Sequence, residues 1–425
     1  MSTVIFMSTI SKLSDDRKQL NVLEPVVLDP LPERPLVSIL ISNYNYGAYL
    51  SDAIESALQQ TYNKLEIVVC DDGSTDASPH ILERYRSQDR RISVVYRANG
   101  GQSLALNAAF RKSTGEIVCL LDADDVFVPN KVQRVVEAFS AAPGAGLAVN
   151  RMLIVDKNRK SLGEIPLLSH LATGWLGPSL NTCGPKVLPG LPPSSGLSLR
   201  RAIAKSIFPL PSGLRAYSDT LIQVLAPRIT PIVGVQAPLS EYRIHGANVA
   251  AVSAFTEDRL RNLAVWEREI WRAWRSHILS SSASSLDAPV PEETPTLMDY
   301  AYARFRSDSG AKTIFRAIPP DYFLALPRLF RWYWRASPMM PNWLFRKAFA
   351  FAYGQTQVKR LVAKILCRFH DSLRALERFL KQIECTGRRV SNTRPSAGLK
   401  ERWMSVAGTE RELRETARFN GMRDE

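Results

Sequence analysis

The sequence predicts an α/β fold in which a mostly parallel sheet is flanked by helices and followed by a mainly helical C-terminal region. Two observations lead to this prediction. Short apolar runs alternate with segments whose apolar residues recur at helical spacing, which is typical of βαβ units. Polar side chains directly follow each of the first four apolar runs, and open parallel sheets bind ligands beyond the carboxyl ends of their strands.

The alternation runs from residue 36 to residue 155. Continuous apolar runs are typical of strands that helices cover on both faces. The expected strands are 36–41, 65–70, 92–96, 117–121 and 147–155. The expected helices are 48–59, 78–86, 102–113 and 129–141, the last with Pro129 in its first turn, where proline is favoured.

Composition excludes several classes of protein. The chain has 425 residues, 45% of them hydrophobic, which is enough for a large core and too much for a disordered chain. No long uncharged apolar window occurs and residues 1–10 contain no basic residue, so we expect neither a transmembrane helix nor a signal peptide. The five cysteines form no CxxC pair, and Cys70 and Cys119 fall in expected strands. We therefore predict buried thiols and a cytoplasmic location.

The formal net charge is +14, and the basic excess is concentrated in residues 321–381. Residues 322–352 mix Arg with aromatic residues, and residues 357–383 combine helical apolar spacing with a basic opposite face. Such segments favour either an anionic membrane surface or packing on another part of a protein. Nucleic-acid binding fits less well, because the charge is local rather than global.

Two acidic clusters follow expected strands. Three carboxylates in Asp122-Ala123-Asp124-Asp125 repel one another, and a hard divalent cation with open positions for phosphate oxygens would offset that repulsion. The alternative is a solvated acidic turn. The pair Asp71-Asp72 could cap the next helix or accept hydrogen bonds from a base or a ribose. Tyr44 could offer its ring to a base or lie in the core.

These motifs occur in a recognisable order. They are Val37-Ser38-Ile39-Leu40-Ile41, Tyr44-Asn45, Tyr49-Leu50, Gln60-Thr61-Tyr62, Glu66-Ile67-Val68-Val69, Asp71-Asp72-Gly73-Ser74-Thr75-Asp76, Asn99-Gly100-Gly101, Asn107, Gly115 and Asp122-Ala123-Asp124-Asp125. In order and spacing, residues 36–129 resemble the family-2 glycosyltransferases, which have the Rossmann-like GT-A fold. The resemblance implies transfer of a sugar from a nucleotide-diphosphate sugar.

The resemblance also implies roles for individual residues. Asp72 resembles the carboxylate that reads the base edge, and Tyr44 the aromatic that stacks on the base. Asp122 resembles the first residue of the DxD motif, near the ribose and sugar. Asp124 resembles the ligand of Mn²⁺ or Mg²⁺. Further residues expected to line the donor site are Asn45, Gly101 and Asn107.

The second half of the site is carried by two later segments. Ser218-Asp219 stands where the family has its acidic pair, so Asp219 is the candidate general base, with a helix cap as the alternative. Tyr242-Arg243-Ile244-His245-Gly246-Ala247-Asn248 resembles the family's YR-x-H-xx-N segment. The resemblance suggests His245 as a metal ligand or a diphosphate contact, and Arg243 as a diphosphate contact or a structural clamp.

Three departures from the family pattern bear on these roles. Ser42-Asn43 replaces the common Pro-Thr and Leu106 replaces the usual Arg, which affects the expected donor; Ser218 replaces the usual Glu beside the base. No QxxRW motif occurs, which favours addition of one sugar over processive synthesis.

The whole chain is thus predicted to be an inverting, non-processive, metal-dependent transferase. We expect a UDP-sugar donor and a saccharide or lipid-linked acceptor, in polysaccharide or glycolipid assembly at the cytoplasmic face of a membrane. The alternative is a non-catalytic protein that binds sugar nucleotides. The expected segments are a polar leader 1–34, a GT-A domain 35–254 with a donor half 35–155 and an acceptor half 156–254, a helical basic and aromatic region 255–385, and a loose polar tail 386–425.

Overall fold

The computed structural model describes residues 25–164, 170–180, 190–245, 256–281, 295–318, 323 and 328–353. The chain divides into two compact units, Met1–Ala325 with Asn342–Gly354 and Leu326–Pro341 with Gln355–Glu425. The predicted segments that lie outside the described residues are most of the leader, the basic amphipathic segment 357–383 and the tail 386–425. The domain boundaries proposed from the sequence stay a prediction.

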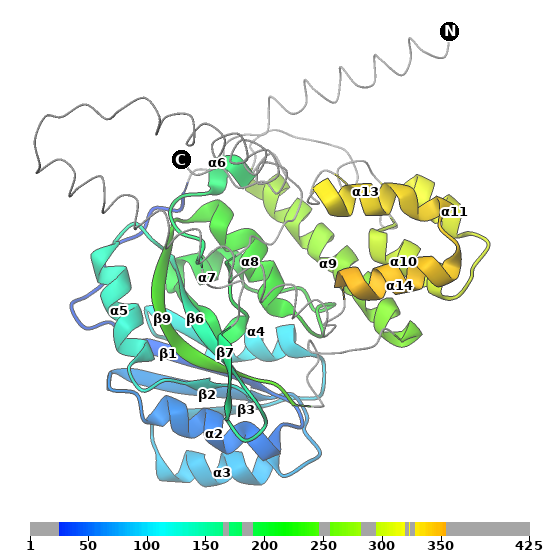
Figure 1. Ribbon diagram of the computed structural model, residues 1–425. Helices are drawn as coiled ribbons and strands as arrows, with labels where there is room; N and C mark the ends of the chain where they lie inside the picture. Colours follow the sequence, from blue (N-terminus) through cyan, green and yellow to red (C-terminus); the bar gives the residue numbers. More distant parts are fainter. Residues whose placement is uncertain are drawn as a thin grey trace, which may run out of the picture. The chain divides into compact units, whose positions relative to one another are not determined.

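A nine-stranded sheet with the strand order β3-β2-β1-β4-β8-β6-β9-β5 forms the centre of the first unit, and β7 pairs with β6 (Figure 1). The strands β1 to β4 are parallel, as predicted. Their bounds are β1 Val37–Asn43, β2 Leu65–Asp71, β3 Ile92–Tyr96 and β4 Ile117–Asp122. Asn43 lies opposite Asp71 and Ser42 opposite Asp122, so these strands end at one edge of the sheet.

Helices cover both faces of these parallel strands, which explains their unbroken apolar sequences. Alternate residues of a strand point to opposite faces, so Ile39 and Ile41 of β1 pack against α2, α3 and α5, whereas Leu40 packs against α4 and α8. The helix bounds are α2 Gly47–Leu58, α3 Ser78–Gln88, α4 Gln102–Lys112, α5 Lys131–Ala141 and α8 Ser218–Ile229. Cys70 and Cys119 are buried free thiols, as predicted.

The first four helices were predicted to within two residues at every end. The helix α5 begins at Lys131, so Pro129 precedes the helix instead of occupying its first turn. A turn hydrogen bond from the backbone N–H of Lys131 to the carbonyl of Val128 starts this helix.

The second half of the sheet is mixed, which modifies the expectation of a mostly parallel sheet. The pairs β4–β8, β6–β8, β6–β7 and β5–β9 are antiparallel, and β6–β9 is parallel. The bounds are β5 Val126–Phe127, β6 Leu147–Val155, β7 Ser161–Glu164, β8 Leu197–Arg200 and β9 Ile232–Arg243. The predicted α/β class is confirmed, and β6 has its predicted bounds.

Sequence reasoning did not identify the long strand β9. Pro238 lies inside it, and proline argues against an inner strand because it cannot donate to the ladder. The register between β6 and β9 shifts on both sides of Arg151, the residue opposite Pro238, so an irregularity in the ladder accommodates the proline.

The region that follows the sheet is helical, as predicted. In the first unit its helices are α9 Glu257–Ser281, α10 Leu297–Phe305, α11 Ala311–Ala317 and α14 Asn342–Tyr353. Thr296 and Asp299 form a capping box at the start of α10. Shorter helical elements of this unit are α6 Gly177–Leu180, η3 Ser194–Gly196 and α7 Arg201–Ile207.

The described part of the second unit contains α13 Arg328–Ala336 and η4 Ser337–Met339. Trp334 is buried, and its carbonyl accepts a hydrogen bond of 2.6 Å from the hydroxyl of Ser337. Across the described ranges of both units, no helix combines the length and the apolar character that crossing a bilayer requires.

Candidate active site at the carboxyl edge of the sheet

The loops after β1 and β2 are fastened together by the carboxylate of Asp71. Asp71 is buried and accepts hydrogen bonds from Asn43 Nδ2 (2.7 Å), Ser74 Oγ (2.6 Å) and Ser74 N (3.0 Å). The amide oxygen of Asn45 accepts a bond of 2.8 Å from the backbone N–H of Thr75. This network fixes the backbone around Tyr44, whose side chain is 46% exposed and presents a ring at this edge.

Asp72 is buried and has its own set of donors. It forms an ion pair with Arg97, and it accepts backbone hydrogen bonds from Gly100 N and, at 2.6 Å, from Gly101 N. Gly101 has φ 98°, and a Cβ there would lie 2.4 Å from Arg215 Cα, so glycine is required. Asp72 therefore holds the loop 97–101; sequence reasoning had not identified Arg97 as its partner.

The second acidic cluster lies at the end of β4. Asp125 is buried and accepts hydrogen bonds from Ser195 Oγ (2.6 Å) and Arg243 N (3.0 Å), and Asp122 accepts one of 3.2 Å from Gln102 Nε2. Burial and the charge of Asp124 raise the pKa of Asp122 and of Asp125 well above the ordinary value. Three carboxylates are thus held together against their mutual repulsion.

The end of β9 brings two predicted residues to this cluster. His245 Nε2 lies 3.0 Å from Asp124 Oδ2, and the two residues are 121 positions apart in the sequence. Arg243 donates from Nε to the backbone oxygen of Asp124 (2.8 Å) and from Nη2 to Asp52 (2.7 Å). Tyr49 stacks near both, with its ring 4.4 Å from the His245 ring and 4.9 Å from the Arg243 guanidinium. These contacts favour the clamp role for Arg243.

Asp219 reaches the same edge from the first turn of α8. Tyr217 is the N-cap residue of α8, and Asp219 is the second residue of the helix. Asp219 accepts a backbone hydrogen bond of 3.2 Å from Ser194 N, and burial raises its pKa. Its charge also raises the pKa of Asp122, so the two carboxylates lie near enough to interact.

A divalent cation fits part of this donor set. Among the described residues, no group of three or more His, Cys, Asp or Glu side chains is arranged to hold a metal ion. Asp124 and His245 nevertheless present an oxygen and a nitrogen ligand within 3.0 Å of each other. Two protein ligands with open positions suit a cation that ligand phosphates and water complete.

Asn107 was expected to line the donor site, but its contacts favour a structural role. It is buried, its Nδ2 donates 2.8 Å to the carbonyl of Leu210, and its Oδ1 accepts 2.7 Å from the N–H of the same residue. Both polar groups of the side chain are therefore used in joining α4 to the segment after α7.

Sequence reasoning also missed a buried lysine behind the acidic cluster. Lys131 is completely buried, and its Nζ donates to Asn150 (2.7 Å) and to the carbonyl of Ser195 (2.8 Å). Burial lowers the pKa of Lys131 to about 8. In the sequence Lys131 resembles any first-turn helix residue, so nothing in the local pattern could have singled it out.

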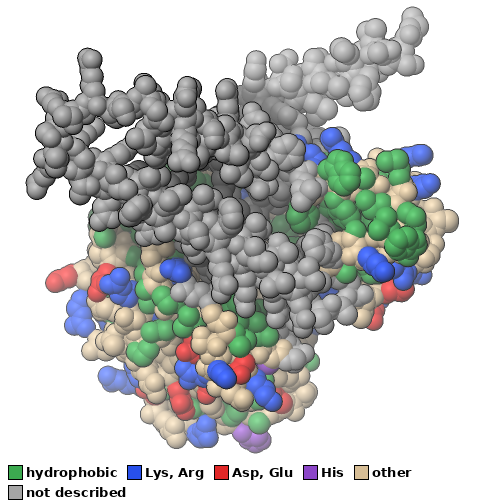
Figure 2. All heavy atoms as spheres, viewed as in Figure 1, with side chains coloured by type: hydrophobic (Ala, Val, Ile, Leu, Met, Phe, Trp, Pro, Cys, Tyr) green, Lys and Arg blue, Asp and Glu red, His purple; other side chains and the backbone are tan. Residues whose placement is uncertain are grey.

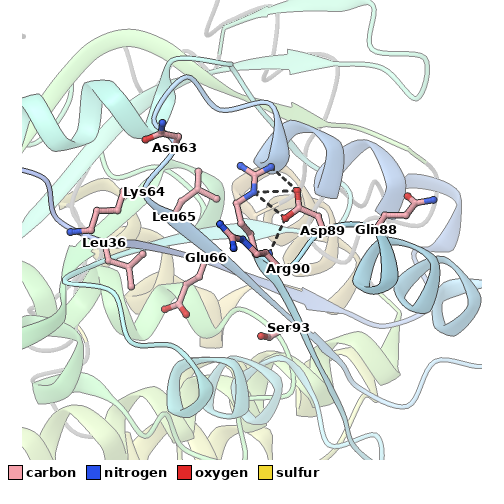
Figure 3. Close-up of a pocket in the computed structure, with 10 residues that line it drawn as sticks. Leu36, Asn63, Lys64, Leu65, Glu66, Gln88, Asp89, Arg90 and Ser93 are labelled. Carbon is pink, nitrogen blue, oxygen red and sulfur yellow. Dashed lines mark hydrogen bonds and ion pairs between the residues drawn. The ribbon is translucent and has the colours of Figure 1, made fainter.

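A pocket lies at the other edge of the sheet. It is lined by residues at the amino ends of β1 to β3, with Leu36, Leu65 and Ser93 among them (Figure 3). Asp89 and Arg91, which form an ion pair of 2.8 Å, also line it. Because the acidic clusters follow the carboxyl ends of the same strands, this pocket is separate from the candidate active site.

Residues 38–174 match the model of the family described as Glycosyl transferase family 2. An uncharacterized glycosyltransferase of Nostoc sp. is 39% identical over 237 residues, which are 54% of this chain and 71% of that protein. Glycosyltransferase GlyG of Streptococcus pneumoniae is 37% identical over 99 residues, 23% of this chain and 33% of that protein.

Two further matches are shorter or more distant. Chondroitin synthase of Escherichia coli is 39% identical over 105 residues, 25% of this chain and 15% of that protein, so this chain spans only a small share of that relative. Among solved structures, TarS 1–349 of S. aureus in complex with UDP-GlcNAc matches with a TM-score of 0.46 and 17% identity, over 73% of this chain and 89% of that chain.

The identity to the Nostoc protein extends over most of that protein and beyond the segment that the family model matches. The order of motifs from residue 36 to residue 129, the α/β sheet and the acidic edge agree with this assignment. The chain therefore belongs to glycosyltransferase family 2 and is a glycosyltransferase.

Proposed function

We propose that this glycosyltransferase moves one sugar from a nucleoside-diphosphate sugar, with a UDP-sugar favoured, to a hydroxyl group of an acceptor, with inversion and with the help of a divalent cation. The observation that carries the proposal is the 3.0 Å contact between Asp124 and His245. This contact joins the acidic segment after β4 to the segment after β9. Two side chains that can bind a metal, from distant parts of the sequence, thus meet at one sheet edge, which favours a metal–diphosphate site. The absence of a QxxRW motif from the sequence favours a single transfer.

On the donor side, the exposed ring of Tyr44 would stack on the base, and Asp122 would face the ribose and the sugar. Asp72 would contribute by holding the loop 97–101 in place beside the base. A cation held by Asp124 and His245 would supply positive charge where the departing diphosphate develops negative charge.

On the acceptor side, Asp219 would act as general base. It would take the proton from the acceptor hydroxyl, whose oxygen forms a bond to the anomeric carbon while the bond from that carbon to the diphosphate breaks. Attack opposite the leaving group inverts the configuration. The raised pKa of Asp219 supports the assignment, because a base whose pKa approaches the working pH accepts a proton more readily.

The acceptor is proposed to be a saccharide or a lipid-linked saccharide in polysaccharide or glycolipid assembly at the cytoplasmic face of a membrane. The helical region supports membrane contact through α14, where Trp343 is 62% exposed and Lys347 lies 5.7 Å from its ring. Figure 2 shows hydrophobic side chains beside Lys and Arg on the helices at the right of the view. Exposed Trp beside basic residues suits the surface of an anionic bilayer.

Flotation of the full chain with liposomes tests the membrane contact. We expect binding to phosphatidylglycerol vesicles, weaker binding to phosphatidylcholine vesicles, and a loss of several-fold in Trp343→Ser. Tyr96→Ser is the matched control, because Tyr96 is 48% exposed but lies at the end of β3. Equal flotation of the two variants, or no binding to anionic vesicles, would contradict the membrane contact.

The donor site is tested by thermal shift of the purified protein with UDP, GDP, dTDP and CMP, each with and without Mn²⁺. A ligand that binds only the folded state raises its apparent stability. We expect a Mn²⁺-dependent rise with one nucleoside diphosphate that is lost in Asp124→Ala. A shift that ignores Mn²⁺ or survives in Asp124→Ala would count against the metal–diphosphate site.

The second candidate is a non-catalytic protein that binds sugar nucleotides, which the departures at Leu106 and Ser218 favour. Release of nucleotide from sugar conjugates of the nucleotide that thermal shift identifies separates the two candidates. Turnover that is lost in Asp219→Asn while binding persists supports the enzyme. Binding without turnover in the unaltered chain supports the non-catalytic protein.

A further inference from the structure

The backbone immediately before the candidate base is in an unusual conformation. Tyr217 has φ 57° and ψ 33°, in the left-handed region, and it is the N-cap residue of α8. Non-glycine residues in this region are strained and persist only where the surroundings hold them, which is common at functional sites. Asp219 follows two residues later, so the conformation of Tyr217 sets the direction in which the first turn of α8 starts.

The helix α9 holds Tyr217 from outside the sheet. The ring of Trp266 meets the ring of Tyr217 edge-on at 5.6 Å, and Trp266 Nε1 donates to the carbonyl of Tyr217 at 3.5 Å. Arg259, two turns earlier on α9, donates to the Tyr217 hydroxyl at 3.4 Å. Ile270 of the same helix is buried in the core that α8 shares, which anchors α9 in place.

The donor half holds the same turn from the other side. Gln102, the first residue of α4, accepts a hydrogen bond of 3.1 Å from the backbone N–H of Ser218 and donates one of 3.2 Å to Asp122. The start of α8 thus has contacts with both α4 and α9. The helix α4 also contacts the acidic cluster, and α9 is the first helix of the helical region. Two independent sets of contacts to one strained turn imply that the first turn of α8 must be placed accurately.

We propose that Tyr217 and Trp266 are positioning residues for the transfer reaction: α9 fixes the left-handed turn that aims Asp219 at the acceptor hydroxyl. The inference rests on the proposed role of Asp219 as the base. The inference gives the helix α9 a role in catalysis that does not depend on membrane contact. It also makes Trp266 a determinant of turnover through its contacts with Tyr217.

Trp266→Ala is the central variant, and Trp274→Ala is its matched control. Both tryptophans lie on α9, are partly buried and pack against the same core, but only Trp266 contacts Tyr217. With the nucleotide sugar from which the unaltered chain releases nucleotide fastest, we expect kcat for nucleotide release to fall about 10- to 100-fold in Trp266→Ala, because small displacements of a catalytic group have large costs. Donor affinity stays within about twofold, and Trp266→Phe restores most of kcat.

Hydrogen–deuterium exchange of the full chain provides a readout that needs no substrate. Exchange in the segment 214–222 should speed up in Trp266→Ala and stay unchanged in Trp274→Ala. The inference is overturned if exchange there is the same in both variants, or if both lower kcat equally. Asp219→Asn distinguishes failure of the proposed base from failure of the proposed positioning role. If Asp219→Asn retains turnover, Asp219 is not the base. If Asp219→Asn loses turnover and Trp266→Ala has an unchanged kcat, only the positioning role is refuted.

Discussion

The two acidic clusters at the carboxyl edge look alike in sequence and differ in their chemistry. Asp71 and Asp72 are buried, but hydroxyl, amide, guanidinium and backbone donors surround them. Asp122 and Asp125 also accept hydrogen bonds, but they lie beside other carboxylates, and burial together with those charges raises their pKa values. Buried carboxylates that are surrounded by hydrogen-bond donors help to hold the fold together. Carboxylates that repel one another lower its stability until a cation binds beside them. The comparison separates the scaffold of the site from its reactive part.

The largest expected effect is a loss of turnover when Asp219, the carboxylate near the cluster of Asp122, Asp124 and Asp125, is replaced. Asp219→Asn keeps the size of the side chain and an oxygen that can accept from Ser194 N, but it removes the base. We expect turnover to fall by about 10²- to 10⁴-fold, the usual contribution of general-base catalysis. Steady-state nucleotide release, with donor binding as the control, measures this. A loss below tenfold would place the base elsewhere.

A matched pair of substitutions tests the comparison itself. Asp72→Asn removes the charge beside Arg97 and turns an NH₂ group toward backbone donors, so we expect it to lower the free energy of unfolding by about 2–4 kcal/mol. Asp122→Asn can still accept from Gln102 and relieves repulsion by Asp124 and Asp219, so stability should be unchanged or higher while turnover is lost.

Chemical unfolding of both variants at pH 8, without divalent cations, gives the two free energies. If Asp122→Asn is the more destabilised of the two, the distinction between scaffold and reactive cluster is wrong.

The smallest expected effect is the pH dependence of stability. Asp219 has a pKa above its ordinary value of 3.8, so the folded protein holds this proton more tightly than the unfolded chain. Its contribution is present below pH 3.8 and is lost as pH rises through the folded-state pKa. Asparagine does not titrate, so the Tm of Asp219→Asn should match that of the unaltered chain below pH 3.8, exceed it increasingly as pH rises to the folded-state pKa, and keep a constant excess above that pKa. Differential scanning fluorimetry with EDTA measures this; a gap that stays constant from below pH 3.8 upward would contradict it.

Sequence patterns predicted the donor half well, because its strands are short, apolar and covered on both faces. The bounds of β3 and β6 were predicted without error, and the residues that meet at the carboxyl edge came from the rule for parallel strands. The long strand β9 was missed because Pro238 argues against an inner strand, and the compensating irregularity at Arg151 involves a residue far away in the sequence.

Within the site, the residues that line it were easier to predict than their hydrogen-bond and ion-pair partners. The approach of His245 to Asp124 and the acidic clusters were expected from motifs. The ion pair of Arg97 with Asp72, the bridge made by Gln102 and the buried Lys131 were not expected, because each depends on packing between elements that are distant in sequence. Asn107 shows the reverse: a motif residue whose hydrogen bonds join two parts of the backbone.

The arrival of β9 at the acidic edge also has a consequence for folding. Arg243 N reaches Asp125 over 118 residues, so this contact closes a long loop and cannot form until the chain up to β9 has been synthesised and its strands have paired. A partly folded or partly synthesised chain would therefore carry the acidic segment without its histidine. With the metal–diphosphate site proposed above, metal-dependent nucleotide binding would therefore report that β9 has joined the sheet.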